Sequence, residues 1–83
     1  MSFSRAARAV AITSPPIMHI QLNGSLHEIA TETSVTDLLV SIGLGAKPVV
    51  VEINEQAVFP RDYPQTTISE GARIEIVMLA AGG

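Results

Sequence analysis

The segment Ser34–Leu44, SVTDLLVSIGL, decides the fold because it predicts a helix that is apolar along one side only. Ser34 with Asp37 three positions later forms a capping-box pattern, with Asp in place of the usual Glu or Gln. Gly43 is well placed to end the helix in a left-handed conformation, with Leu44 packing back over it. The apolar residues recur at i, i+3, i+4 and i+7 and form one stripe: Val35, Leu38, Leu39 and Ile42. A helix with one apolar stripe covers one surface, so we expect it to lie across a sheet and not within a bundle.

Two predicted strands precede this helix and form a hairpin. Apolar and polar side chains alternate along residues 18–22, as in a half-buried strand. The Asn-Gly pair at 23–24 is the commonest short hairpin signal and returns the chain as a second strand at 25–30. Leu26 and Ile29 cannot share one face of that second strand without a bulge.

Three further strands are predicted after the helix. Residues 49–53 are β-branched and apolar on both faces until Glu52, which is typical of a central strand. A short strand follows at 57–59, and residues 60–64, with a proline at each end, predict an irregular connection. In the final strand, residues 74–79, one face is assigned to the core: Ile74, Ile76 and Met78.

This order of elements predicts an α+β fold of the β-grasp, or ubiquitin-like, type. A mixed four- to five-stranded sheet packs on one main helix, and the first and last strands pair in parallel at the sheet centre. We expect this domain to occupy residues 18–79, between a disordered N-terminal extension at 1–17 and a flexible C-terminal tail at 80–83.

The extension, residues 1–17, differs in composition from everything after it. It lacks acidic residues, contains Arg5 and Arg8, and closes with a proline pair that resists helix and sheet. Arg8 interrupts its only apolar run, which argues against a secretory signal, whereas an organellar transit peptide fits the composition. We favour an unstructured extension made from an upstream start codon, with Met18 as the natural first residue. The expected location is therefore the cytoplasm, or a plastid or other organelle if the extension is a transit peptide.

The composition excludes several classes of protein. The 83 residues form one small domain, and 47% hydrophobic residues are too many for a disordered chain. The absence of cysteine excludes disulfides, thiolate metal sites, a thiol nucleophile and a plant-type iron–sulfur ferredoxin. No apolar run reaches the roughly 18 residues that span a bilayer. His19 and His27 lack a cluster of further ligands, so we expect solvated strand residues and no metal site.

The charge of the predicted domain points to a protein partner. From Met18 onward, three basic residues stand against eight acids, a balance of 3 − 8 = −5. This acidity argues against a nucleic-acid partner and favours a protein whose docking face is basic or apolar. The chain has neither a Ser-His-Asp arrangement nor a Gly-rich phosphate loop before a helix, so we expect no enzyme activity of its own.

The last four residues, Ala80, Ala81, Gly82 and Gly83, are the predicted functional end of the chain. They have little or no side chain to bury, so the segment should leave the fold as a flexible tail. Its one notable chemical group is the α-carboxylate of Gly83, on a stalk slim enough to enter a narrow cleft. Exposed apolar residues beside the tail suggest a docking surface for a partner: Leu79, Val77, Val50 and Phe59.

Residues 18–83 resemble the ThiS family, the sulfur carrier proteins of thiamine (thiazole) biosynthesis. The resemblance covers 66 residues (83 − 17) and depends on four stretches: MHIQLNG, ETSVTDLLVSIGL, VVVEINEQAVFPRDYP and ISEGARIEIVMLAAGG. The chain departs from the family pattern at Ala72, where an acidic residue is common, and at Tyr63, where Trp is frequent. Neither position carries the terminal carboxylate.

The resemblance implies a protein cosubstrate that other proteins charge with sulfur. An activating enzyme similar to the ubiquitin E1 enzymes (ThiF type) uses ATP and Mg²⁺ to adenylate the Gly83 carboxylate. A persulfide from a sulfur donor displaces AMP and leaves a C-terminal thiocarboxylate. A ThiG-type thiazole synthase then takes the sulfur. The carrier itself binds no cofactor and is a monomer in isolation.

Three other functions use the same architecture. The small subunit of molybdopterin synthase would deliver sulfur to a pterin precursor, but its body is usually longer than these 66 residues (83 − 17). A ubiquitin-like modifier would join Gly83 to a lysine through an isopeptide bond. A plain β-grasp binding module would keep its partner after deletion of Gly82 and Gly83, whereas a carrier would lose all sulfur transfer.

Overall fold

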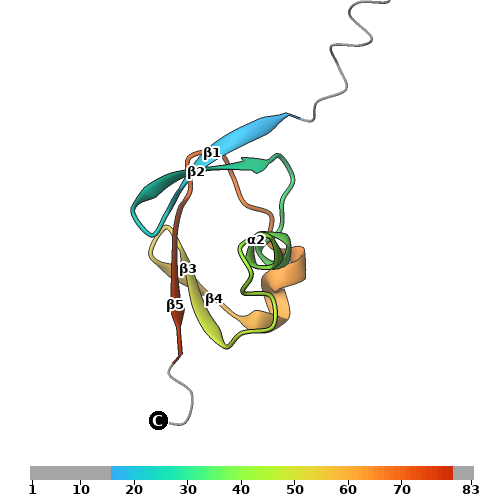
Figure 1. The fold of residues 1–83 in the computed structure, drawn as a ribbon, viewed down its shortest axis with the longest axis vertical. Coiled ribbons are helices and arrows are strands. Elements are labelled where there is room, and N and C mark those ends of the chain that lie inside the picture. Colours follow the sequence, from blue (N-terminus) through green and yellow to red (C-terminus); the bar gives the residue numbers. More distant parts are fainter. Residues whose placement is uncertain (1–15, 80–83) are drawn as a thin grey trace, which may run out of the picture.

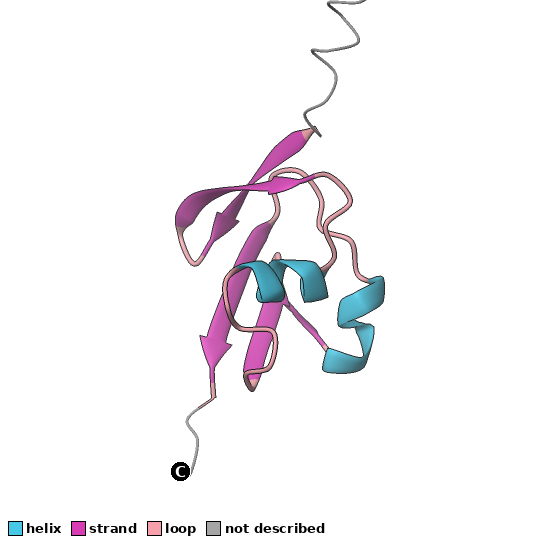
Figure 2. Ribbon diagram, turned by 45° about the vertical axis from the view of Figure 1, so that its right-hand side comes forward, coloured by secondary structure: helices cyan, strands magenta, loops and turns pink. Residues whose placement is uncertain are grey.

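A five-stranded mixed sheet carries one main helix on one of its faces (Figures 1 and 2). The computed structural model describes residues 16–79. The strand order is β2-β1-β5-β3-β4, so the first and last strands of the chain are neighbours within the sheet. In chain order the elements are β1 (Ile17–Leu22), β2 (Ser25–Ala30), α2 (Val35–Ser41), β3 (Val49–Ile53), β4 (Gln56–Val58), the 3-10 helix η1 (Pro60–Gln65) and β5 (Arg73–Met78).

The pairing of β1 with β5 joins the two halves of the sheet. These strands are parallel, with Gln21 opposite Arg73 and Leu22 opposite Ile74. The ladder is short, and the side chain of Asn23 extends it: its Oδ1 accepts from the Ile76 N–H at 2.7 Å, and its Nδ2 donates to the Ile76 carbonyl at 3.2 Å. The predicted parallel pairing at the sheet centre is therefore confirmed. Beyond the end of β1, the amide side chain of Asn23 makes the hydrogen bonds to β5 that the backbone of a longer strand would make.

The hairpin of β1 and β2 has the predicted turn but no bulge. Asn23 and Gly24 both adopt positive φ, 49° and 85°, as a tight two-residue hairpin turn requires. The register then runs without interruption through six residue pairs. Ile29 is buried, whereas Leu26 is 68% exposed on the opposite face, so the two residues do not share a face and no bulge is needed.

Helix α2 begins and ends as the sequence predicts. The Ser34 hydroxyl accepts the backbone N–H of Asp37 at 3.0 Å, which satisfies one of the unpaired donors of the first turn. At the other end Gly43 has φ of 83°. The N–H of Gly43 donates to the Val40 carbonyl at 3.1 Å, and the N–H of Leu44 donates to the Leu39 carbonyl at 2.7 Å. These two bonds are those of a Schellman motif, which closes the helix and turns Leu44 back toward the core.

The core lies between α2 and the sheet face that it covers. Its buried residues come from every element except β4 and η1, together with two positions just before β5: Met18, Ile20, Ile29, Val35, Leu38, Leu39, Val49, Val51, Ile68, Ala72, Ile74 and Ile76. The assignment of Ile74 and Ile76 to the core is correct. The assignment of Met78 is wrong, because Met78 is 53% exposed. It shares the inner face with Val49, its register partner, but it lies at the very end of β5.

Four other predictions are corrected by the structure. Residues 60–65 form the 3-10 helix η1 and not an irregular connection, since Pro at its start supplies the required φ. β4 spans Gln56–Val58 and β5 spans Arg73–Met78, each one residue earlier than predicted. β1 begins at Ile17, so the last residue of the predicted extension belongs to the sheet.

Strand β3 is internal, as predicted, but it is buried on one face only. It pairs with β4 on one side and with β5 on the other. Val49 and Val51 are buried, whereas Val50 between them is exposed on the face that α2 does not cover. We call this second side of the sheet the open face.

No helix within residues 16–79 combines the length and the apolar character that crossing a membrane requires. The predicted extension, apart from Pro16 and Ile17, and the predicted tail at 80–83 lie outside the described residues.

The two side-chain bonds of Asn23 predict a measurable loss when they are removed. Asn23→Gly keeps the positive φ at no steric cost but loses both bonds to Ile76, so we expect about 2 kcal/mol of destabilisation in urea unfolding. Asn54→Gly is the matched control, because Asn54 also has positive φ (50°) but its side chain makes one bond, from the Arg73 N–H, at an exposed site. We expect about half the loss there. Equal losses would contradict the role given to Asn23.

Candidate functional site

The end of β5 positions the C-terminal segment. β5 pairs with β3 through Met78, opposite Val49, and the N–H of Leu79 donates to the Pro48 carbonyl at 2.8 Å. The chain is thus held to the sheet up to its last described residue, at the end of the molecule far from the start of β1 (Figure 1). The predicted sulfur-carrying residue Gly83 and its stalk of Ala80, Ala81 and Gly82 lie outside the described residues.

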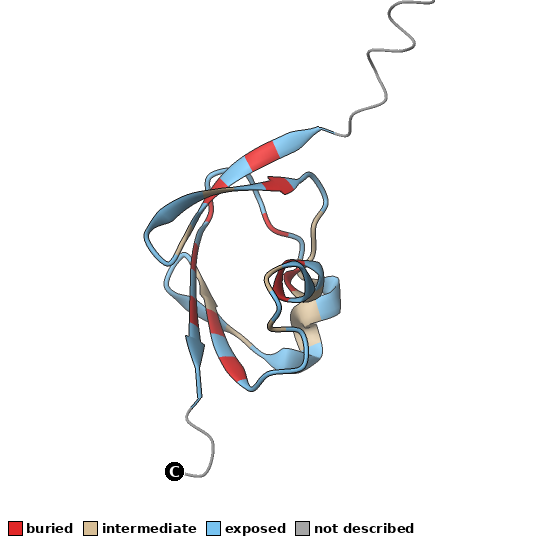
Figure 3. Ribbon diagram, viewed as in Figure 1, coloured by how far each residue is buried: buried red, intermediate tan, exposed pale blue. Residues whose placement is uncertain are grey.

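Three of the four predicted docking residues lie side by side on the open face. Val50 and Val77 are register partners on β3 and β5. Phe59 follows directly after the pair Val51–Val58, which places it on the other side of Val50. These three side chains, Phe59, Val50 and Val77, are between 40% and 59% exposed, and we call them the apolar row. Figure 3 shows this exposure at the end of β5, next to the buried segment of the same strand.

A cation lies at one end of the apolar row. The Arg61 guanidinium carbon stands 5.3 Å from the centroid of the Phe59 ring, a cation–π contact at an exposed site. This contact holds Arg61 over the ring and adds positive charge at the η1 end of the row.

Leu79, the fourth predicted docking residue, lines a hollow beside the end of β5. The hollow is formed by three separate segments of the chain, with walls that include Lys47, Pro48, Pro60, Tyr63 and Leu79. The Tyr63 hydroxyl donates a long hydrogen bond, 3.4 Å, to the Val49 carbonyl. Burial raises the pKa of the Tyr63 phenol, so this hydroxyl remains protonated at neutral pH. Sequence reasoning missed the hollow because no single stretch contains it.

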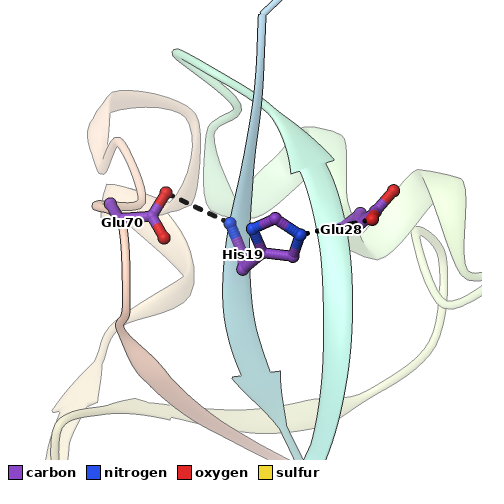
Figure 4. A network of polar contacts seen from close by, with 3 residues as sticks. All are labelled: His19, Glu28 and Glu70. Carbon is purple, nitrogen blue, oxygen red and sulfur yellow. Dashed lines mark hydrogen bonds and ion pairs between the residues drawn. The ribbon is translucent and has the colours of Figure 1, made fainter.

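The two histidines lie on opposite faces of the hairpin. His19 is on the open face, where its Nε2 lies 3.2 Å from Oε2 of Glu28, its cross-strand partner, and its backbone N–H donates to Oε1 of Glu70 at 3.2 Å (Figure 4). His27 lies opposite Ile20 and is half-buried, so it is less solvated than predicted. Within residues 16–79 no three His, Cys, Asp or Glu side chains are grouped as metal ligands.

Comparison with known proteins identifies the family. The model of the ThiS family matches residues 20–83, which include all of the sheet from Ile20 onward and the terminal diglycine. The chain belongs to the ThiS family. A solved member, the thiamine biosynthesis protein (ThiS) of Geobacter metallireducens, superimposes with a TM-score of 0.69 at 28% sequence identity. The match covers 80% of this chain and 100% of that one, and it confirms the predicted β-grasp fold and family.

Curated relatives of the chain include two longer proteins. They are the thiazole synthases of Magnetococcus marinus, 33% identical over 66 residues, and of Paramagnetospirillum magneticum, 30% identical over 66 residues. Each match covers 80% of this chain but 20% of the relative. The ThiS-like chain therefore spans about a fifth of the length of these thiazole synthases.

The face assignment of β5 predicts that two acidic substitutions differ strongly in their effect on stability. Leu79→Asp should change the free energy of unfolding by less than about 1 kcal/mol, because Leu79 is 49% exposed. Ile76→Asp should cost more than about 4 kcal/mol and unfold the chain, because it buries a charge in the core. Circular dichroism during thermal unfolding distinguishes them. If Leu79→Asp unfolds the protein, the Leu79 side chain is packed into the fold and is not on the exposed side of the chain.

Proposed function

We propose that this protein carries sulfur as a thiocarboxylate on Gly83 and donates it for thiazole formation in thiamine biosynthesis. The observation that carries the proposal is the ThiS family match, which extends through the diglycine to residue 83. The structure supports it because β5 pairs with β3 through Met78 and the N–H of Leu79, four residues before that end, donates to the Pro48 carbonyl. A rigid body that delivers a short stalk of small residues suits a carrier whose end must enter another protein.

The chemistry requires activation from outside the chain. A carboxylate is a poor acyl electrophile, so an oxygen of the Gly83 carboxylate first attacks the α-phosphorus of ATP and pyrophosphate leaves. The resulting acyl adenylate has a good leaving group, AMP, which the terminal sulfur of a donor persulfide displaces to give an acyl disulfide. A second thiol, on the donor or on the activating enzyme, then attacks the donor sulfur of that S–S bond, which releases the thiocarboxylate and leaves a new disulfide. An activating enzyme of the ThiF type would supply the ATP, Mg²⁺ and oxyanion stabilisation. In this scheme the carrier is a cosubstrate and contributes an accessible end.

The small residues of the stalk determine which sites it can enter. Ala80, Ala81, Gly82 and Gly83 present at most a methyl group each. Glycine at the last two positions allows the backbone of an enzyme to approach closely and leaves φ unrestricted. A side chain at either position would obstruct entry to a narrow active site.

The apolar row is the proposed docking surface of the carrier. Phe59, Val50 and Val77 expose contiguous apolar surface on the side of the sheet that lacks a helix, close to where the stalk begins. Leu79 in the adjacent hollow extends that surface toward the stalk. The thiazole synthases that contain a matching segment support a ThiG-type enzyme as one partner, and the activating enzyme is the other.

Intact-mass analysis tests the proposed chemistry directly. After incubation with ATP, Mg²⁺, a ThiF-type enzyme and a persulfide donor, we expect a species in which one terminal oxygen is replaced by sulfur. A variant lacking Gly82 and Gly83 should retain the folded spectrum of the intact chain and acquire no sulfur. Unchanged mass of the intact chain beside an activating enzyme that is active on its own carrier would refute the proposal.

The docking role of the apolar row is tested with two matched substitutions on the open face. Val77→Asp should lower kcat/KM for adenylation about tenfold, since it places a charge within the proposed contact, at the β5 end of the apolar row. Leu26→Asp places the same charge on an exposed leucine of β2, far from the stalk, and should leave kcat/KM nearly unchanged. Pyrophosphate release measures both. Equal effects of the two variants would argue against a localised docking surface.

A further inference from the structure

Two glutamates of the open face directly oppose each other beside the apolar row. Glu52 on β3 and Glu75 on β5 are register partners, immediately next along the ladder on this face to the pair Val50–Val77. Side chains at directly opposed positions have Cβ atoms about 5 Å apart, and two like charges in such a pair destabilise the sheet. The pair therefore costs stability.

The neighbours of the two carboxylates on the open face do not neutralise them. Ala57 lies opposite Glu52 on β4, and the amide of Asn23, next to Glu75 on the β1 side, is engaged by Ile76. The nearest cation along β5, Arg73, directs its guanidinium to Glu55 at 3.3 Å. Among the described residues neither Glu52 nor Glu75 has an ion pair or a side-chain hydrogen bond.

We infer that Glu52 and Glu75 together receive a lysine or arginine side chain of the thiazole synthase that takes sulfur from this carrier. The inference rests on the proposed function and specifies the surface that the partner must present. An unneutralised carboxylate pair beside exposed apolar side chains is complementary to a cation at the edge of an apolar patch. A guanidinium between the two carboxylates would also attract both of them and so offset their mutual repulsion in the complex.

The charges on the open face make the docking surface polarised. The acidic pair lies on one side of the apolar row, and Arg61 lies over Phe59 at its η1 end. A partner with a base facing the glutamates and an acid facing Arg61 can dock in one orientation, because the reversed orientation places like charges together. This orientation fixes the direction in which the stalk after Leu79 enters the partner. The partner surface is thus basic at one end only, and not basic throughout as the net charge alone suggests.

Charge removal at the pair tests this inference through opposite effects on binding and stability. With the full-length chain and a ThiG-type thiazole synthase, we expect Glu52→Gln/Glu75→Gln to raise Kd about tenfold at low ionic strength. The difference should shrink at high salt, where screening weakens the charge contact of the native chain. The same double variant should unfold at an equal or higher temperature than the native chain, because the repulsion is gone.

Glu32→Gln is the control, because it removes one negative charge from an exposed loop residue outside the open face. It should leave Kd unchanged, and Glu75→Gln alone should weaken binding severalfold. Equal Kd for the double variant and the native chain would overturn the inference. So would a loss of binding that is independent of salt and accompanied by a lower unfolding temperature, since that pattern indicates a structural role.

Thiocarboxylate formation, which tests the carrier function, is measured separately on the same protein preparation. If the native chain becomes a thiocarboxylate but does not bind the thiazole synthase, the docking inference fails and the carrier chemistry stands. If no thiocarboxylate forms with an active activating enzyme, the proposed function itself fails.

Discussion

A single helix can cover only one face of a sheet, and this constraint determines which residues of the sheet are buried and which are exposed. The apolar stripe of α2 contributes three fully or nearly buried side chains, Val35, Leu38 and Leu39, to a core that includes residues from four strands. Burial on that side supplies the main stabilising free energy of a domain this small. The other side of the same sheet stays in contact with solvent. The features assigned to partner binding on the sheet itself, the apolar row and the glutamate pair, lie on that uncovered side.

The helix α2 in turn depends on contacts with the segment between η1 and β5. A helix of seven residues is too short to be stable by itself, so its ends must be held by tertiary contacts. The N–H of Val35 donates to the Thr66 carbonyl at 3.0 Å, and the N–H of Ile68 donates to the Thr33 carbonyl at 2.9 Å. These bonds tie the start of α2 to the stretch between η1 and β5. The start of α2 is therefore fixed relative to the segment that leads into β5.

Sequence reasoning succeeded where the signal is local. The Ser34 cap, the left-handed Gly43 and the Asn-Gly turn depend on a few neighbouring residues, and each was predicted correctly. It failed where the outcome depends on distant parts of the chain. Alternation correctly placed Met78 on the inner face, but its exposure depends on how far the core extends along β5.

Features that combine several segments could not be read from the sequence. The opposition of Glu52 and Glu75 depends on the register of β3 against β5, which are separated by β4 and η1 in the chain. The hollow beside Leu79 combines residues of three segments, so no motif reveals it. The exposure of Val77 and Leu79 was nevertheless predicted from the alternation of side chains along the final strand.

The place of β5 in the sheet has a consequence for the synthesis of the protein. β5 is the last of the five described strands to be translated, yet it lies between β1 and β3 and contributes Ile74 and Ile76 to the core. A nascent or prematurely terminated chain that lacks β5 has two unconnected half-sheets and exposed apolar surface, which proteases and chaperones recognise. Folding thus acts as a check on translation: a molecule that has reached its native state has been translated at least as far as Met78.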